Sequence, residues 1–353
     1  MTENKHLTYF KVENFKRFSH FEISDLKQIN LIVGDNNVGK TSLLEALVLD
    51  ENIDQLLFNF LNALAWREVG GPKLFPTNYL RYFISSYGNK ITYNIKTAND
   101  EKTIALEVKE VSTLNPDEII LVQKKLMLNK DTQKYIAIFD DGINKQVAFL
   151  NDQLRSVKLY VPLVPFHLGY KDDLVRFYSE KIQPSKKLQA ELVENLKIFI
   201  SDIEDIDIST NVIPDQPYIV IRLKNRDETM PLTMFGDGAV KLFRILCEIA
   251  MCSGSRLLVD EIDTGVYFAR FNQYWQTILK AAEANSVQIF ATTHSIDCLK
   301  YFNEVLKDDN LKHLQKKSKV FALKELPDKT VKAYGYDFEN FNSAIENEIE
   351  IRG

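Results

Sequence analysis

The densest chemistry in this sequence lies in the loop Gly34-Asp35-Asn36-Asn37-Val38-Gly39-Lys40-Thr41, which fits the phosphate-binding pattern G-x-x-x-x-G-K-[ST] without a mismatch. Glycines let backbone N–H groups turn inward around phosphate oxygens, and the N-terminus of a following helix adds its positive dipole end. Lys40 would contact the β- and γ-phosphates, and the Thr41 hydroxyl would ligate Mg²⁺. The loop therefore predicts binding of a nucleoside triphosphate with Mg²⁺, against the alternative of a chance glycine turn.

The segments beside this loop supply the structure that the pattern requires. Residues 29–33 are mostly apolar and read as a short buried strand, and Thr41 to Leu47 contains good helix formers. A strand, a glycine-rich loop and a helix form the context in which the pattern identifies a nucleotide site. The predicted nucleotide contacts are Gly34, Asp35, Asn36, Asn37, Val38, Gly39, Lys40, Thr41 and Ser42.

Two acids follow a second apolar segment, in Leu257-Leu258-Val259-Asp260-Glu261. Asp260 is predicted to hold Mg²⁺ through water, and Glu261 to orient or deprotonate the attacking water. Acids often follow buried strands simply because strands end at the surface, so this pattern gains its meaning from the phosphate loop. Thr41 and Asp260 are therefore the predicted metal ligands, and Glu261 joins Lys40 as a predicted catalytic residue.

A histidine ends the next apolar segment, in Ala291-Thr292-Thr293-His294-Ser295. A histidine at that place can contact the γ-phosphate and help to position Glu261. A solvent-facing histidine at a strand end is the alternative. His294 stands at the end of the next predicted strand after Asp260, so we assign it as the third predicted catalytic residue.

A second glycine pair precedes a predicted helix, in Phe235-Gly236-Asp237-Gly238-Ala239. Glycines that open a helix make an anion-binding nest, so Gly236, Asp237 and Gly238 are further predicted nucleotide contacts. The alternative is a tight turn in which Asp237 lies near a helix N-cap. Its position shortly before Asp260 favours the nest.

The spacing of these motifs selects one class of phosphate-loop proteins. More than half of the chain separates Lys40 from Asp260, whereas AAA+ ring ATPases and small GTPases place the two elements much closer. A long separation fits the ABC class, in which a sheet and a helical subdomain lie between the motifs, and in which the nest closes on the γ-phosphate of an opposing subunit. We therefore expect an α/β fold with a mixed or parallel core sheet.

The remaining sequence predicts three regions. Residues 1–160 form an ATPase lobe with an antiparallel β subdomain, because β-like segments recur at 91–96, 103–108, 135–139 and 146–150. Residues 161–230 form a helical and β insertion, with helices expected at 172–183 and 185–200 and strands at 203–208 and 218–223. Residues 231–353 form a second ATPase lobe, with helices at 238–252 and 266–284, strands at 256–259, 287–292, 320–324 and 331–336, and an acidic terminal helix.

Composition describes an ordinary globular chain. Of 353 residues, 45% are hydrophobic and 26% charged, and the net charge of −5 gives no overall basic field for nucleic acid. Three cysteines without metal-type spacing fit a reducing compartment. The N-terminus is polar and no apolar run approaches the roughly 20 residues of a membrane helix. We expect a cytoplasmic protein without a membrane partner.

The chain resembles the RecF-like, OLD-type branch of ABC ATPases, often described simply as AAA family ATP-binding proteins. The residues that carry the resemblance are the opening Val12-Glu13-Asn14-Phe15-Lys16-Arg17-Phe18, the phosphate loop, Gly236 to Gly238, Asp260-Glu261, Thr293-His294-Ser295 and the C-terminal residues 336–352. The resemblance implies that Lys16 and Arg17 border the base or ribose, unless they are only a solvated strand end. Tyr267 stands where relatives often carry a histidine, and Gln55 is a candidate for the additional Mg²⁺ ligand.

The resemblance also implies a function. Two or more copies would sandwich ATP, and closure would control a separate effector, as expected of bacterial phage-defence ATPases paired with a nuclease or of proteins in DNA maintenance. Too few residues follow Glu261 for a Toprim nuclease domain, and no sustained heptads predict an SMC-type coiled coil. The alternative is a scaffold that binds DNA or protein and uses ATP as a clamp without turnover. The basic run at 312–319 could contact phosphate backbones, although a solvated helix end explains it better.

Overall fold

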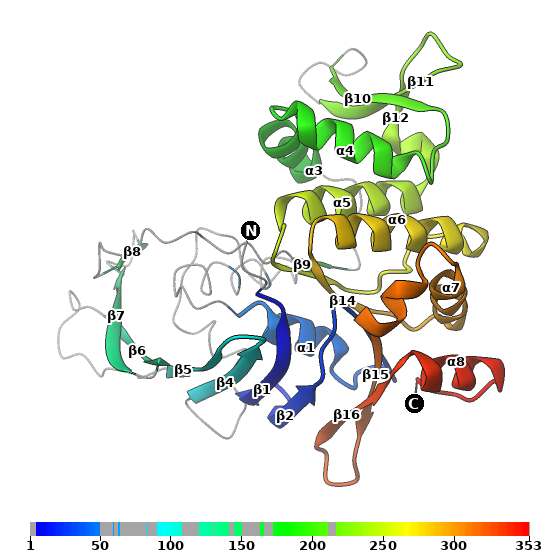
Figure 1. Cartoon of the computed structure of the whole chain (residues 1–353). Helices are drawn as coiled ribbons and strands as arrows, with labels where there is room; N and C mark the ends of the chain where they lie inside the picture. The colour runs from blue at the N-terminus through cyan, green and yellow to red at the C-terminus, as the bar shows by residue number, and fades with distance from the viewer. Residues whose placement is uncertain are drawn as a thin grey trace.

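The structure is a computed structural model of the chain (Figure 1), and it describes residues 5–49, 59, 63, 83, 90–107, 120–128, 130–140, 145–149, 163–165, 172–210 and 217–352. Its strands form three sheets of six, seven and three strands. The fold is α/β, with a mixed sheet at its centre and separate antiparallel sheets, as the sequence predicts.

The central sheet has the order β16-β15-β3-β14-β13-β9. Its members are β16 (Val331–Tyr336), β15 (Ser318–Glu325), β3 (Ile29–Gly34), β14 (Gln288–Thr292), β13 (Arg256–Val259) and β9 (Leu163–Val164). Neighbours from β15 to β9 run parallel, and β16 alone among these strands pairs antiparallel, with β15. Parallel neighbours bring the C-terminal ends of β3, β13 and β14 to one edge, where ligands bind in open α/β sheets.

Both faces of this sheet are buried, which explains why its strands are apolar almost throughout. On β3, Leu31 and Val33 belong to one hydrophobic cluster and Ile32 belongs to the other. The first cluster joins the sheet to α5 (Asp237–Met251), α6 (Phe271–Ala284), α7 (Ile296–Lys307) and α8 (Phe338–Glu346). The second joins it to α1 (Lys40–Leu47) and to the antiparallel sheet.

The antiparallel sheet has the order β2-β1-β4-β5-β6-β7-β8. Its strands are β1 (Leu7–Phe15), β2 (Phe18–Ser24), β4 (Lys90–Thr97), β5 (Glu101–Glu107), β6 (Ile120–Leu128), β7 (Lys130–Asp140) and β8 (Lys145–Phe149). Figure 1 shows this sheet extending away from the central sheet toward β7 and β8. The expected antiparallel β subdomain is therefore present, with β6 as a strand that the sequence pattern did not identify.

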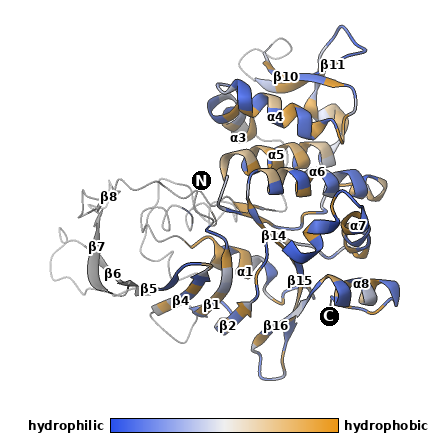
Figure 2. Cartoon of the chain, in the orientation of Figure 1, coloured by the Kyte–Doolittle hydropathy of each residue, from blue (hydrophilic) through white to orange (hydrophobic). Residues whose placement is uncertain are grey.

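A layer of helices lies beyond α5. It contains α3 (Asp172–Phe177), a π-turn (Tyr178–Ile182) and α4 (Lys186–Leu196), and it carries the small sheet of β10 (Ile203–Ser209), β11 (Tyr218–Leu223) and β12 (Met230–Pro231). Because α5 has this layer on one side and the core on the other, it is hydrophobic over most of its surface (Figure 2). The predicted division at 160 and 230 stays a prediction.

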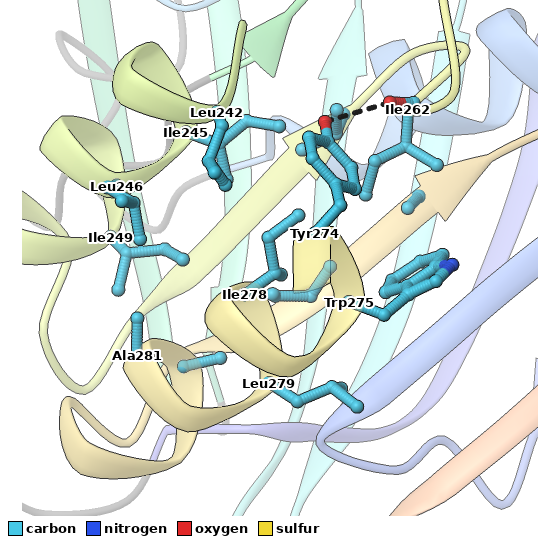
Figure 3. Close-up of a cluster of buried hydrophobic side chains, with 14 of the residues drawn as sticks. Leu242, Ile245, Leu246, Ile249, Ile262, Tyr274, Trp275, Ile278, Leu279 and Ala281 are labelled. Carbon is cyan, nitrogen blue, oxygen red and sulfur yellow. Dashed lines mark hydrogen bonds between the residues drawn. The ribbon is translucent and has the colours of Figure 1, made fainter. Parts of the chain in front are cut away.

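Figure 3 shows how α5 is fixed against α6. Apolar side chains from the two helices interdigitate, and burial of each Leu or Ile contributes roughly 1.5–3 kcal/mol. The Tyr274 hydroxyl, on α6, donates to the main-chain carbonyl of Ile262, 2.9 Å away. This contact anchors the loop that follows β13. The labelled side chains are Leu242, Ile245, Leu246, Ile249, Ile262, Tyr274, Trp275, Ile278, Leu279 and Ala281.

Two predicted elements differ from the structure. The helix expected at 266–284 begins only at Phe271, after a short 3-10 turn (Phe268–Arg270). Gly265 has φ +79°, and Tyr267 is extended, so the chain turns before it becomes helical. The helix expected at 172–183 leaves α-helical geometry at the π-turn. Both apolar patterns predict burial correctly but not the local backbone.

Candidate functional site

The phosphate loop connects β3 to α1, as its sequence context requires. At Gly34, φ is +148°, and a Cβ would lie 2.6 Å from the main-chain oxygen of Leu323. At Gly39, φ is +111°, and a Cβ would lie 2.9 Å from Arg17 Cδ. A side chain at either position would therefore collide with the surrounding structure. Both glycines are needed for the shape of the loop.

Lys40 is the first residue of α1 and is buried. Its amine donates to the main-chain oxygens of Gly34, at 2.7 Å, and Asp35, at 2.8 Å. Burial lowers the pKa of Lys40, while the charges of Asp260, Glu261 and Asp35 oppose that shift. The ammonium is thus held inside the loop by two carbonyls, at the place where phosphate oxygens would enter.

Asp260 lies directly after β13, and its carboxylate accepts hydrogen bonds from two threonine hydroxyl groups. Thr41 Oγ1 donates to Asp260 Oδ2 at 2.9 Å, and Thr292 Oγ1 donates to Asp260 Oδ1 at 2.7 Å. The side chain is almost entirely buried, at 4% exposure. The structure therefore brings the two predicted metal ligands into direct contact: Thr41 lies on α1, after β3, and Asp260 follows β13.

Glu261 follows with an unusual backbone. Its φ is +44°, in the left-handed region that costs a residue with a side chain on the order of 1–3 kcal/mol. Its N–H donates to Thr292 Oγ1 at 2.7 Å, and its carbonyl accepts from the N–H of Thr264 at 3.0 Å and from the amine of Lys241. The surrounding hydrogen bonds thus hold the carboxylate in a defined orientation.

The carboxylate of Glu261 meets the predicted histidine. Glu261 Oε1 lies 3.4 Å from His294 Nε2, and Thr264 Oγ1 donates to Glu261 Oε2 at 3.2 Å. Both side chains of the pair are about one-third exposed, at 35% and 37%. A partly exposed carboxylate beside a histidine is accessible to a water molecule, which is the geometry that general base chemistry requires.

The glycine nest lies at the N-terminus of α5. Gly236 has φ +86°, and a Cβ there would meet no atom of the described residues within 4 Å. Gly238 packs against the loop after β13, because a Cβ would lie 3.1 Å from the carbonyl oxygen of Gly265. Asp237 is the first residue of α5, and no side-chain cap closes the helix start. Among the described residues, Gly236 is thus open to its surroundings, whereas Gly238 is packed.

The remaining sequence candidates have varied surroundings. Lys16 pairs with the buried Glu45 and lies over the Phe83 ring, and Arg17 pairs with Glu325 beside the loop. Both are therefore engaged within the chain, and their proposed contacts with a base or ribose stay predictions. Tyr267 is exposed. Gln55 lies outside the described residues.

Sequence reasoning did not assign roles to Thr292 or Arg352. Thr292 bridges Asp260 and Glu261, as described above. Arg352 Nη1 donates to the main-chain oxygen of His294 at 2.9 Å, and Glu350 holds the guanidinium at 2.6–2.7 Å. The hydrogen bonds from Arg352 lower the pKa of Glu350 to about 2. Thr292 stands at a strand end like any other threonine, and Arg352 lies in the C-terminal segment that the resemblance includes. Neither partner can be read from the sequence, since only the tertiary fold brings them together.

Arg352→Ala should lower kcat for ATP hydrolysis about 10-fold, because the His294 loop loses an anchor and small misplacements near a reaction centre are costly. The affinity for ATP should stay within about twofold of wild type, since no phosphate contact is removed. Steady-state phosphate release measures the first quantity and nucleotide titration the second. Arg270→Ala is the matched control, because Arg270 also donates to a main-chain oxygen, that of Phe199, away from the site. Unchanged kcat in Arg352→Ala would contradict this role.

These residues fit a triphosphate with Mg²⁺. The loop supplies a buried ammonium at a helix N-terminus, and Thr41 with Asp260 supplies hard oxygen donors that Mg²⁺ prefers. Among the described residues, no group of three or more His, Cys, Asp or Glu is arranged to hold a metal ion. No helix in the described part of the chain is long and apolar enough to span a membrane.

Comparison with known proteins agrees with this geometry. A family model described as "AAA domain, putative AbiEii toxin, Type IV TA system" matches residues 29–297, from β3 to the start of α7. An "ATP/GTP phosphatase" of Helicobacter pylori is 23% identical in an alignment of 379 residues, gaps included. The alignment covers 97% of this chain and 99% of that protein. The "DNA replication and repair protein RecF" of Nitrosococcus oceani is 41% identical over 44 residues, or 12% of each chain.

One solved structure supports the fold. It is an Smc head bound to the C-winged helix domain of ScpA, with 13% sequence identity and a TM-score of 0.51. The match covers 95% of this chain and 99% of that chain. At this level of identity the resemblance is one of fold.

Proposed function

The chain belongs to this AAA domain family, and from that premise we propose that it is a Mg²⁺-dependent ATPase switch whose copies close around ATP. The observation that carries the proposal is one cluster at the C-terminal edge of three parallel strands. Lys40 lies beyond β3, Asp260 and Glu261 follow β13, and His294 follows β14. The contacts between Thr41, Asp260 and Thr292 tie these segments together.

Each residue has a defined task in the proposed reaction. Lys40 binds and orients the β- and γ-phosphates, and Thr41 and Asp260 would hold Mg²⁺, which neutralises phosphate charge. Glu261 accepts a proton from a water molecule while the oxygen of that water bonds to the γ-phosphorus. The bond between the γ-phosphorus and the β–γ bridging oxygen then breaks. His294 steadies the Glu261 carboxylate and contacts the γ-phosphate. The products are ADP and inorganic phosphate.

A second copy completes the site in this proposal. Among the residues that the structure describes, nothing covers Gly236, which supports a nest that receives the γ-phosphate bound to a partner. Closure would form a homodimer or a higher homo-oligomer and change the surface offered to a separate effector. The family resemblance favours a nuclease as that effector, in phage defence or DNA maintenance, and nucleic acid is a further candidate partner.

A mixing experiment tests hydrolysis and the composite site together. Lys40→Ala removes the loop ammonium. Gly236→Asp places a carboxylate in the nest, where a Cβ meets no atom of the described residues, although φ +86° strains any side chain at this position. Each variant alone should release almost no phosphate from ATP. An equimolar mixture should recover about a quarter of wild-type turnover, because half of the dimers are mixed and each has one intact site of two. Circular dichroism checks that both variants fold.

The outcomes separate the alternatives. An inactive mixture beside an active wild type would contradict the composite site. A wild type without turnover would favour the second candidate function, a scaffold that binds DNA or protein and uses ATP as a clamp. The specific observation against that scaffold is Glu261, whose accessible carboxylate beside His294 has no use in a clamp. Light scattering with and without ATP reports the accompanying change in mass.

A further inference from the structure

Lys241 is a buried lysine for which the reaction described above has no use. It lies on α5, about one helical turn after Gly238, and its side chain is only 3% exposed. A buried ammonium is costly unless acceptors and opposite charges surround it. A lysine among the apolar residues of a helix that is covered on both sides therefore calls for a specific explanation.

The partners of Lys241 lie in the loop after β13. Its amine donates to the main-chain carbonyl of Glu261. Burial lowers the pKa of Lys241 to about 8, while Asp263, Asp260 and Glu261 act in the opposite direction. Among charged groups the lysine thus faces three carboxylates on one short loop. Lys241 therefore connects α5 to the acidic loop that follows β13.

The carbonyl that Lys241 contacts belongs to a residue in a left-handed conformation. Glu261 keeps φ +44° because hydrogen bonds fix the peptide groups on both sides of it. The N–H is fixed by Thr292 Oγ1, and the carbonyl is fixed by Lys241 and the N–H of Thr264. Loss of the lysine would leave the carbonyl side with the contact from Thr264, so the carboxylate direction would be less well defined.

The same helix carries the glycine nest. Gly238 packs against Gly265, and Lys241 contacts Glu261, so α5 touches this loop at two points. A phosphate bound at the nest would therefore act on α5 at its N-terminus, one turn from the Lys241 bridge. Resting on the proposed hydrolytic role of Glu261, we propose that Lys241 is a positioning residue that couples the nest to the orientation of the Glu261 carboxylate.

Lys241→Met tests this assignment, because methionine fills similar space without a charge or a donor. With Mg²⁺ and ATP, kcat should fall about 10- to 100-fold, and ATP affinity should change less than about threefold. Lys241→Arg, which keeps a donor, should retain most of the rate. Lys280→Met, an exposed lysine on α6, is the matched control. Should Lys241→Met fail to fold, Lys241→Gln, whose amide is too short to reach the carbonyl, takes its place.

A double variant separates positioning from general stability. In Glu261→Gln, the Lys241→Met change should lower the remaining rate less than about twofold, because the carboxylate that the lysine positions is already absent. Equal fold losses in both backgrounds, or wild-type kcat in Lys241→Met, would overturn the inference. Equal turnover in wild type and Glu261→Gln would instead overturn the proposed function and this inference with it.

Discussion

Lys40→Ala should lower the affinity for ATP about 100-fold or more and make hydrolysis undetectable. The ammonium that now bonds Gly34 and Asp35 would turn to the β- and γ-phosphates of a bound nucleotide. Hydrogen bonds to charged groups contribute about 1.5–3 kcal/mol each, so the loss of two such contacts corresponds to at least this change in Kd. Titration with a fluorescent ATP analogue measures the affinity, and phosphate release measures the rate.

The control for Lys40→Ala is Lys280→Ala, because Lys280 is exposed on α6 and away from the loop. Its affinity for ATP should equal that of wild type. Lys40→Arg should not restore binding, since the longer planar guanidinium does not fit a loop built around a compact ammonium. ATP affinity within about threefold of wild type in Lys40→Ala would contradict the assignment of this loop as the phosphate site.

The elements of the site follow from local sequence patterns more reliably than the contacts within it. The strand before Gly34, the helix after Lys40, and the apolar strands before Asp260 and before His294 all lie where the pattern predicts them. Short-range periodicity determines these elements, because a buried parallel strand must be apolar along its length. The parallel order of the strands then brings the motifs to one edge of the sheet.

Contacts made by single polar residues are not visible in the sequence. Thr292 resembles any threonine at the end of a strand, yet it bridges Asp260 and Glu261. Lys241 resembles an exposed lysine on an amphipathic helix, yet it is buried and donates to the main-chain carbonyl of Glu261, in the loop after β13. Such residues acquire partners from segments distant in sequence. Their environment becomes apparent only when the layers are assembled.

The loop after Glu261 shows a third kind of limit. The apolar residues from Val266 onward predict a helix, but the backbone first turns at Gly265, and α6 begins at Phe271. Val266 and Gly265 pack against Gly238, so the extended loop is selected by contact with the nest rather than by intrinsic preference. The error in the predicted helix boundary therefore falls where two parts of the candidate site meet.

Glu261→Gln should lower kcat for ATP hydrolysis about 10²- to 10⁴-fold, the range expected when a general base is removed. The amide keeps the size and the hydrogen-bonding capacity of the side chain, so the left-handed backbone and the contact with Thr264 should persist. ATP should bind with wild-type affinity, because Lys40, Thr41 and Asp260 are unchanged. Single-turnover phosphate release separates this chemical step from nucleotide binding.

The same variant should also accumulate an ATP-bound assembly. In the proposed cycle, hydrolysis removes the γ-phosphate that joins the phosphate loop of one copy to the nest of the other, so a hydrolysis-blocked chain stays closed. Light scattering should therefore show at least a doubled mass for Glu261→Gln with ATP, and not with ADP. Glu283→Gln is the matched control, because Glu283 is similarly exposed, at 31%, and pairs with His313 and Lys317 away from the site. Equal turnover in wild type and Glu261→Gln would exclude Glu261 as the base, and an unchanged mass with ATP would exclude a nucleotide-gated assembly.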